Sequence, residues 1–284
     1  MSMQVLSSAR PSPIAGTWYE GDPQSLARNV DTYMDEARLP DLPGELVAVI
    51  APHAGHRYSG AVAGYAFATL RGRSFDLVAV IAPMHHPYRE PLLTTAHAAY
   101  ATPLGLVPVD REAVEELNRA LQASVGFGLS AVSNDPEHSL EIELPFLQRA
   151  LSGDFRLLPV MVRSQQQDIS QALGKALAGV LRGKNAMLVA STDLSHFYDQ
   201  KVALRLDRAM LEQVEAFSPE GIFQAERSGK GFACGHAAMA AVLWAARELG
   251  ADTVQILRHA TSGDVTGDYA GVVGYAAAAV LKKA

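Results

Sequence analysis

Two near-copies of one phrase constrain the fold of this chain more than any other feature. Residues 45–60 read ELVAVIAPHAGHRYSG, and residues 76–91 read DLVAVIAPMHHPYREP. In each copy an apolar, β-branched run without polar alternation ends at Ala-Pro, and histidine follows. Such runs are typical of strands that are buried on both faces of a parallel sheet. The repeat therefore predicts two parallel strands that each deliver histidine at the carboxyl end.

The segment between the two copies predicts a helix. Residues 59–71 are rich in alanine and other small residues at helical spacing, and Gly72 can end the helix. The whole is a β-α-β unit of the usual length, about 30 residues. Parallel neighbours place their carboxyl ends at one edge of the sheet, where α/β sheets bind ligands. We therefore expect His53 and either His85 or His86 to lie side by side in a site.

A third apolar run ends in the same way. Residues 185–190 are followed by STDLSH, which contains Asp193 and His196. If this strand joins the same parallel sheet, both side chains enter the cleft. Asp193 is then expected to orient a histidine and fix its tautomer, and His196 to transfer protons. The alternative, that this segment is a helix cap with Asp193 in the first turn, is compatible with a site.

Residues 134–151, NDPEHSLEIELPFLQRAL, predict a helix that begins at Asp135 and Pro136. His138 and Glu141 would share one face of this helix, three residues apart. We expect them to support a metal site from behind its ligands, and the alternative is a solvated acidic first turn. Pro145 is expected to kink or break the helix.

The single cysteine lies in GFACGH, just before an apolar helix. The N-terminus of a helix favours a thiolate, so Cys234 suits either a metal ligand or a nucleophile. In the first case His53, His85 and Cys234 hold an ion, and this donor set suits Fe(II), Zn(II) or Cu better than Mg or Ca. Three protein ligands leave a position open for chemistry or ligand exchange.

In the second case Cys234 attacks a substrate, with His196 or His236 as the base. A serine hydrolase is disfavoured because no GxSxG motif appears.

The lead-in PSPIAGTWYEGDP supplies Trp18, which either caps the core or forms a pocket wall.

Length and charge limit the remaining possibilities. The 284 residues contain no Ser/Gly linker or charge block that would mark a boundary, so we expect one α/β domain spanning residues 1–284, with about the first 12 flexible. Its central sheet should be mostly parallel or mixed and flanked by helices. A net charge of −6 with scattered Lys and Arg argues against nucleic acid and membrane partners. No apolar stretch is long enough to span a bilayer and no secretory signal is evident, so we expect a cytoplasmic protein.

Six motifs in this order resemble the MEMO family, of the AmmeMemoRadiSam system protein B type. They are AGTWY, APHAGHRYSG, APMHH, PEHSLEIELPF, STDLSH and CGH, and they run from about Ala15 toward the C-terminus. That family is similar in fold to the class III extradiol dioxygenases, which bind non-haem Fe(II) with two histidines and a glutamate. The resemblance implies that His53, His85 and Cys234 bind the metal and that His196 is the acid/base, with Asp193 beside it.

The resemblance also implies a pocket and partners. Trp18 and Tyr58 match aromatics near the family's pocket. Animal members are described as cell-motility effectors that bind phosphotyrosine peptides and as iron- or copper-binding redox proteins. Microbial members are often associated with AMMECR1-like and radical-SAM proteins. A thiolate in place of the dioxygenases' carboxylate softens the site and raises its affinity for Cu(I) or Zn, so ring cleavage does not follow from the fold.

The leading hypothesis is a mononuclear Fe- or Cu-dependent redox or dioxygenase-like enzyme that acts on a small molecule. His86, His138, Glu141 and His236 are expected around the ligands. The contrasting hypotheses are a non-catalytic protein that binds a peptide or small ligand in the same cleft, and a Zn- or Cys-dependent hydrolase.

Overall fold

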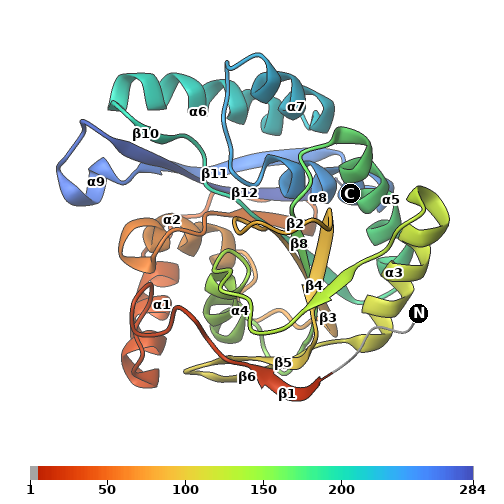
Figure 1. Ribbon diagram of the computed structural model, residues 1–284. Helices are drawn as coiled ribbons and strands as arrows, with labels where there is room; N and C mark the ends of the chain where they lie inside the picture. Colours follow the sequence, from red (N-terminus) through yellow and green to blue (C-terminus); the bar gives the residue numbers. More distant parts are fainter. Residues whose placement is uncertain (1–5, 284) are drawn as a thin grey trace.

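Four parallel strands form the centre of the main sheet. The computed structural model (Figure 1) describes residues 6–283, and its hydrogen-bond pairing places these strands in a continuous row. Their spatial order is β2 (Glu45–Ala51), β9 (Ala186–Ser191), β3 (Leu77–Pro83) and β8 (Arg156–Val162). Nearly all of their residues are buried, because helices cover both faces of the sheet.

Strands at both sides make this a mixed sheet. Beyond β2, the long strand β12 runs antiparallel, and both β11 and β10 pair with β12; beyond β8, strand β4 runs antiparallel and pairs with β7. The bounds are β12 (Val272–Lys282), β11 (Thr253–Thr261), β10 (His196–Tyr198), β4 (Leu92–Thr95) and β7 (Ser130–Val132). The expected α/β fold with a mixed sheet is confirmed.

Helices cover the sheet in two groups. One face carries α3 (Arg111–Val125), α5 (Gln167–Leu181) and α8 (His236–Glu248), at the right of Figure 1. The other carries α1 (Pro23–Glu36), α2 (His56–Ala68), the single turn η1 (Glu141–Glu143) and α4 (Leu144–Ala150). The strand pair β11–β12 is covered by α6 (Gln200–Glu215), which packs against α7 (Pro219–Arg227), and α9 (Gly263–Thr266) lies in the connection between the two strands.

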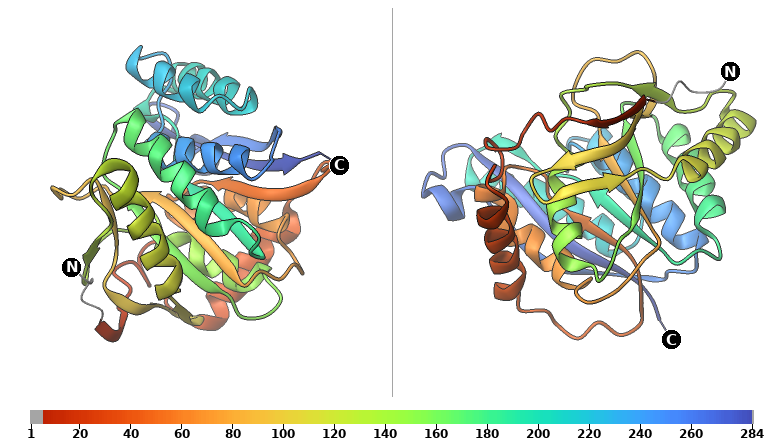
Figure 2. Two further views of the ribbon diagram at one scale, coloured as in Figure 1. Left: turned by 90° about the vertical axis from the view of Figure 1, so that its right-hand side faces the viewer. Right: turned by 90° about the horizontal axis from the view of Figure 1, so that it is seen from below.

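A smaller sheet contains the beginning of the described chain. Strand β1 (Leu6–Arg10) runs parallel to β5 (His97–Thr102), and β5 forms a hairpin with β6 (Gly105–Pro108). This sheet faces the viewer in the right-hand view of Figure 2. Part of the lead-in expected to be flexible thus forms a strand, and its first five residues lie outside the described range.

Two local expectations are wrong. Strands β2 and β3 are not immediate neighbours, because β9 lies between them and pairs with both. No helix begins at Asp135 and Pro136; the chain is irregular there, and helix α4 begins after Glu143 with Pro145 in its first turn. Pro145 therefore starts a helix rather than breaking one, since the first turn needs no N–H donor at that position.

None of the helices among residues 6–283 has the length and apolar character needed to cross a membrane.

Candidate metal centre

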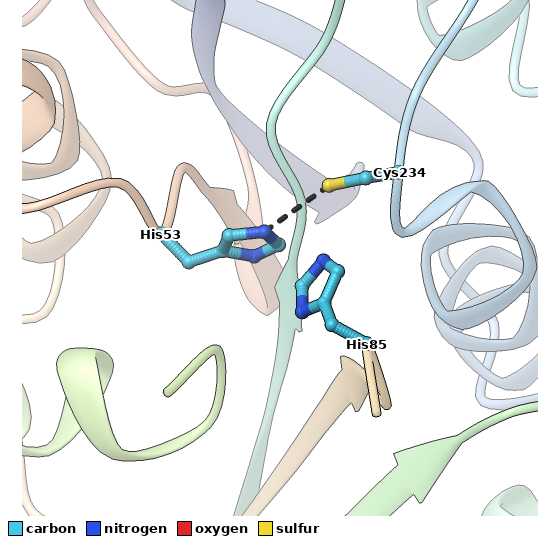
Figure 3. A group of neighbouring side chains, drawn as sticks. All are labelled: His53, His85 and Cys234. Carbon is cyan, nitrogen blue, oxygen red and sulfur yellow. Dashed lines mark hydrogen bonds between the residues drawn. The ribbon is translucent and has the colours of Figure 1, made fainter. Parts of the chain in front are cut away.

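Three side chains from distant segments meet at the carboxyl edge of the main sheet. His53 follows β2, His85 follows β3, and Cys234 lies just before α8. Figure 3 shows the two imidazoles and the thiol directed toward one another. One ligand atom from each lies within 4.8 Å of the other two, and Sγ of Cys234 is 3.1 Å from Nε2 of His53. The structure thus selects His85 rather than His86, which is not part of this group.

The imidazole of His53 is buried and held in one tautomer. Its Nδ1 lies 2.9 Å from Oγ of Ser191, and that hydroxyl donates its own hydrogen to the carbonyl of Ser139 at 2.6 Å. Oγ of Ser191 must therefore accept, so Nδ1 carries the proton and Nε2 keeps a free lone pair. Burial, with the neighbouring His138 and His85, lowers the pKa of His53 well below its ordinary value. The result is a neutral imidazole with Nε2 ready to coordinate.

The imidazole of His85 is held by a carboxylate. Oε1 of Glu137 lies 2.9 Å from Nδ1 of His85, and Oε2 accepts the backbone N–H of the same histidine. Burial by itself would raise the pKa of Glu137, but the hydrogen bonds with His85 and with the backbone N–H of Ser139 hold it below its usual range. Metal-binding histidines commonly donate their second N–H to a carboxylate or carbonyl. His85 has that arrangement through Glu137, and His53 has a comparable one through the hydroxyl of Ser191, so the donor set fits a metal ion.

The thiol of Cys234 does not show the thiolate character expected of a helix N-terminus. Burial, and then the nearby Asp193 carboxyl, raise the pKa of this thiol. Cys234 also precedes Gly235, the N-cap of α8, so it lies outside the first turn where free N–H groups act. The neutral S–H faces the lone pair on Nε2 of His53, and a soft cation could displace its proton.

Asp193 holds main chain rather than an imidazole, contrary to expectation. Its Oδ1 accepts the backbone N–H of His53 at 2.8 Å and that of Ala54 at 3.3 Å, while its carbonyl accepts the N–H of Cys234. Burial raises the pKa of Asp193 to about 7. One residue therefore links the backbones of two candidate ligands, and the tautomers are fixed instead by Ser191 and Glu137.

His138 and Trp18 form one wall of the site. The His138 ring stacks on His85 with centroids 4.8 Å apart, and the indole of Trp18 lies on His138 at 4.1 Å. Burial lowers the pKa of His138 to about 4, so it is neutral near pH 7. Trp18 is 38% exposed, whereas the adjacent Tyr19 is buried in the core. Of the two alternatives for Trp18, the structure supports the pocket wall.

A second group of potential ligands, His85, Glu137 and His138, overlaps the first. The Glu137 carboxylate in this group is already hydrogen-bonded. Its Oε1 accepts Nδ1–H of His85 and the backbone N–H groups of His138 and Ser139, all at 2.9 Å. A cation bound there would have to replace these donors. The group therefore supports His85 rather than forming a metal site of its own.

His196 lies beside the ligands on the segment after β9. Its Nδ1 is buried and has no hydrogen-bond partner among residues 6–283, and its ring meets Phe232 edge-on at 5.6 Å. Burial lowers the pKa of His196, and the neighbouring His85 lowers it further. A neutral imidazole with an unused nitrogen can accept a proton.

The structure does not bring Glu141 or His236 to the ligands. The Glu141 carboxylate is buried against Arg10, Ser12 and Tyr19, so it belongs to a separate polar cluster. Nδ1 of His236 faces the carbonyl of Ala233 at 3.1 Å, and its ring packs against Phe223 of α7.

A cavity of about 440 Å3 adjoins the centre. It is lined by the aromatic side chains of Trp18, Tyr58, Phe197 and Tyr275, together with Ala54 next to His53. Asp268 is the only charged residue in its lining. The cavity therefore suits an apolar or planar group and offers no cation to an anionic one.

Sequence reasoning missed two residues that orient the ligands. From the sequence, Glu137 falls in the acidic first turn of the helix expected at Asp135, and Ser191 is the first residue of STDLSH, whose alternative interpretation is a helix cap. The available signal for Glu137 was its position beside His138 in PEHS, but its partner lies 52 residues away in the chain. Nothing local marks that contact.

Comparisons with known proteins place the chain in a family. The family model described as Memo-like protein matches residues 10–279. The chain is 33% identical to a MEMO1 family protein of Nitrosopumilus maritimus, covering 94% of this chain and 98% of the relative. It is 35% identical to the MEMO1 family protein MTH_45 of Methanothermobacter thermautotrophicus, with the same coverage, and 35% identical to a relative from Aeropyrum pernix, covering 94% and 97%. The chain therefore belongs to the Memo-like protein family.

Proposed function

We propose that this protein is a metal-dependent enzyme that holds one ion between Nε2 of His53, Nε2 of His85 and Sγ of Cys234. The observation that carries the proposal is that both imidazoles have their Nδ1 atoms engaged, so that their remaining nitrogens face a shared space with the thiol. Two nitrogens and one sulfur suit Fe(II), Cu or Zn(II).

The reaction we propose is oxidation of a small molecule with dioxygen as the oxidant. The bound metal would supply open coordination positions and redox or Lewis-acid chemistry. His196 would accept a proton from a substrate hydroxyl, since its imidazole is neutral and only partly buried. His138, also neutral, would offer a second polar contact beside His85.

The adjoining cavity favours an uncharged substrate with a planar or apolar group. Trp18, Tyr58, Phe197 and Tyr275 would enclose that group, and the absence of Lys or Arg from the cavity lining disfavours a carboxylate or phosphate there. Ala54 and Gly55 line the cavity and directly follow His53 in the chain, so a substrate in the cavity would lie beside the segment that carries this candidate ligand.

Metal content after anaerobic purification tests the ligand assignment. Wild type should hold close to one equivalent of metal, and His53→Ala and Cys234→Ala should each lose most of it. His86→Ala is the matched control, because this residue adjoins His85 without joining the ligand group. Equal metal content in all four proteins would remove the assignment.

A second candidate function, a non-catalytic protein that binds a ligand in the same cleft, is favoured by the aromatic cavity alone. Oxygen uptake with a panel of catechols and phenols separates the two, since a pure binder consumes no oxygen at any metal loading. A hydrolase with Cys234 as nucleophile is less favoured because burial raises the pKa of its thiol.

The family resemblance carries two further proposals. The first is a cytoplasmic location, and the second is functional association with AMMECR1-like and radical-SAM proteins. Cell fractionation tests the location, and co-purification at endogenous expression tests the association.

A further inference from the structure

A buried carboxylate outside the metal centre holds the segment that carries His196. Asp207 of α6 is fully buried, and its two oxygens serve different parts of the chain. Oδ1 accepts the backbone N–H of Ser195 at 3.0 Å, and Oδ2 lies 2.9 Å from Nε2 of His259 on β11. Helix α6, the segment after β9 and strand β11 are thereby joined at one side chain.

Strand β12 leaves space for the Asp207 carboxylate at Gly274. A Cβ atom on Gly274 would overlap the Asp207 carboxylate, so only glycine leaves the space. Gly274 also pairs with the same segment, since its N–H donates to the carbonyl of Ser195 and its carbonyl accepts the N–H of Leu194, both at 2.8 Å. Three hydrogen bonds therefore fix the backbone on the N-terminal side of His196.

The side chain of His196 contributes little to its own placement. Its Nδ1 has no hydrogen-bond partner among the described residues, and its ring is held by edge contacts to Phe197 and Phe232. Phe197 is itself 78% exposed and has a left-handed backbone with φ 62°. The position of the imidazole therefore depends on the backbone that Asp207 and Gly274 hold.

We infer that Asp207 is a positioning residue for His196, and that His259 holds the Asp207 carboxylate from its outer side. Asp207 makes no contact with the candidate ligands and acts through the Ser195 N–H. The inference deepens the proposed function, because a fixed imidazole matters only if His196 transfers protons. The effect of Asp207 on the placement of His196 can be measured whether or not the protein has catalytic activity.

The test compares three changes with a matched control. Asp207→Ala removes both hydrogen bonds, and Asp207→Asn keeps an oxygen that can accept the Ser195 N–H. His259→Leu removes only the outer partner, at a residue that is partly exposed and therefore less prone to abolish folding. Glu212→Gln, on the same helix, neutralises an exposed carboxylate that pairs with Arg208 and serves as the control.

Two measurements report on the segment directly. Amide hydrogen exchange of residues 193–198 should accelerate about tenfold or more in Asp207→Ala, and less in His259→Leu, while exchange in β2 and β3 stays as in wild type. The NMR signals of the His196 imidazole, assigned by their loss in His196→Gln, should shift or broaden in Asp207→Ala. Asp207→Asn should restore most of both, and the Glu212→Gln control should match wild type.

The outcomes separate this inference from the proposed function. Unchanged exchange and unchanged His196 signals in Asp207→Ala and His259→Leu would overturn the inference. Uniformly faster exchange throughout the protein would also overturn it, because that result indicates a general stabilising role. If the segment loosens in these variants while His196→Gln retains full oxygen uptake, the positioning stands and the proposed role of His196 fails.

Discussion

The carboxylate of Glu137 holds His85 at two points, through Nδ1 at 2.9 Å and through the backbone N–H. The imidazole is otherwise partly open to solvent, with 32% of its side chain exposed. Its orientation toward His53 therefore depends on the buried Glu137 carboxylate, together with the stacked ring of His138.

Glu137→Gln should weaken metal binding by about 10- to 100-fold, because an amide offers one acceptor where the carboxylate offers two, and ligand orientation is lost with it. Competition with a chelator of known affinity measures the change. Glu90→Gln, an exposed residue after His85 on the same connection, is the control and should bind as wild type does. Wild-type affinity in Glu137→Gln would show that His85 needs no support.

The polar cluster around Arg10 should make a large contribution to stability. The guanidinium is 1% exposed and bonds the carboxylates of Asp135 and Glu141 as well as the carbonyl of Glu137. Arg10→Met leaves two buried carboxylates without their cation, which should lower the free energy of unfolding by about 3–5 kcal/mol. Urea denaturation measures this loss.

The matched control for that variant is Arg71→Met, which removes an exposed ion pair with Asp35. Such pairs are worth about 0–1 kcal/mol. If the two variants lose similar amounts of stability, the buried cluster is not a structural anchor. Because Arg10 also holds the carbonyl of Glu137, its loss should in addition weaken metal binding.

The sequence allowed the convergence of His53 and His85 to be predicted, because a repeated strand pattern implied a shared sheet edge, whereas Cys234 was a candidate only from its position before a helix and from the family resemblance. It also predicted the helix between the two copies of the repeat, which the structure has as α2. These signals are local, or follow from the rule that parallel strands align their carboxyl ends.

What could not be predicted depends on partners distant in the chain. Asp135 and Pro136 carry the local signals of a helix start, but the Asp135 carboxylate bonds Arg10, 125 residues away. Glu137 accepts the N–H groups of His138 and Ser139 with its own side chain while holding His85. These tertiary contacts outweigh the local preference for a helix, and no pattern within residues 134–151 reveals them.

The free energy of unfolding should decrease as the pH falls, because His56 is buried in its neutral form. This residue is buried in α2, its Nε2 donates to the carbonyl of Ile142 at 3.1 Å, and burial lowers its pKa to about 4. In the unfolded chain the pKa is near 6.5, so below that pH the unfolded state takes up a proton that the folded state refuses. Stability from this group is complete above about pH 6.5 and is lost as the pH falls toward 4, by about 3 kcal/mol.

Comparison with His56→Gln isolates this contribution, because glutamine can donate to Ile142 and does not titrate. The difference in unfolding free energy between wild type and variant should change by about 3 kcal/mol between pH 7 and pH 4, with wild type losing more. A constant difference over that range would mean that the folded and unfolded states take up the proton equally, so that folding does not lower the pKa of His56.

The state of Cys234 can be read from its reactivity, since it is the only cysteine in the chain. Burial raises the pKa of its thiol, and the S–H faces Nε2 of His53 at 3.1 Å, so little thiolate is present near pH 8. Alkylation by iodoacetamide in the metal-free protein should be at least about tenfold slower than in the urea-unfolded chain, whose thiol has an ordinary pKa near 8.5. Added Zn(II) should slow it further by occupying Sγ. Rapid alkylation that bound metal does not slow would instead identify an activated nucleophile, and would favour the hydrolase over the metal-dependent oxidase.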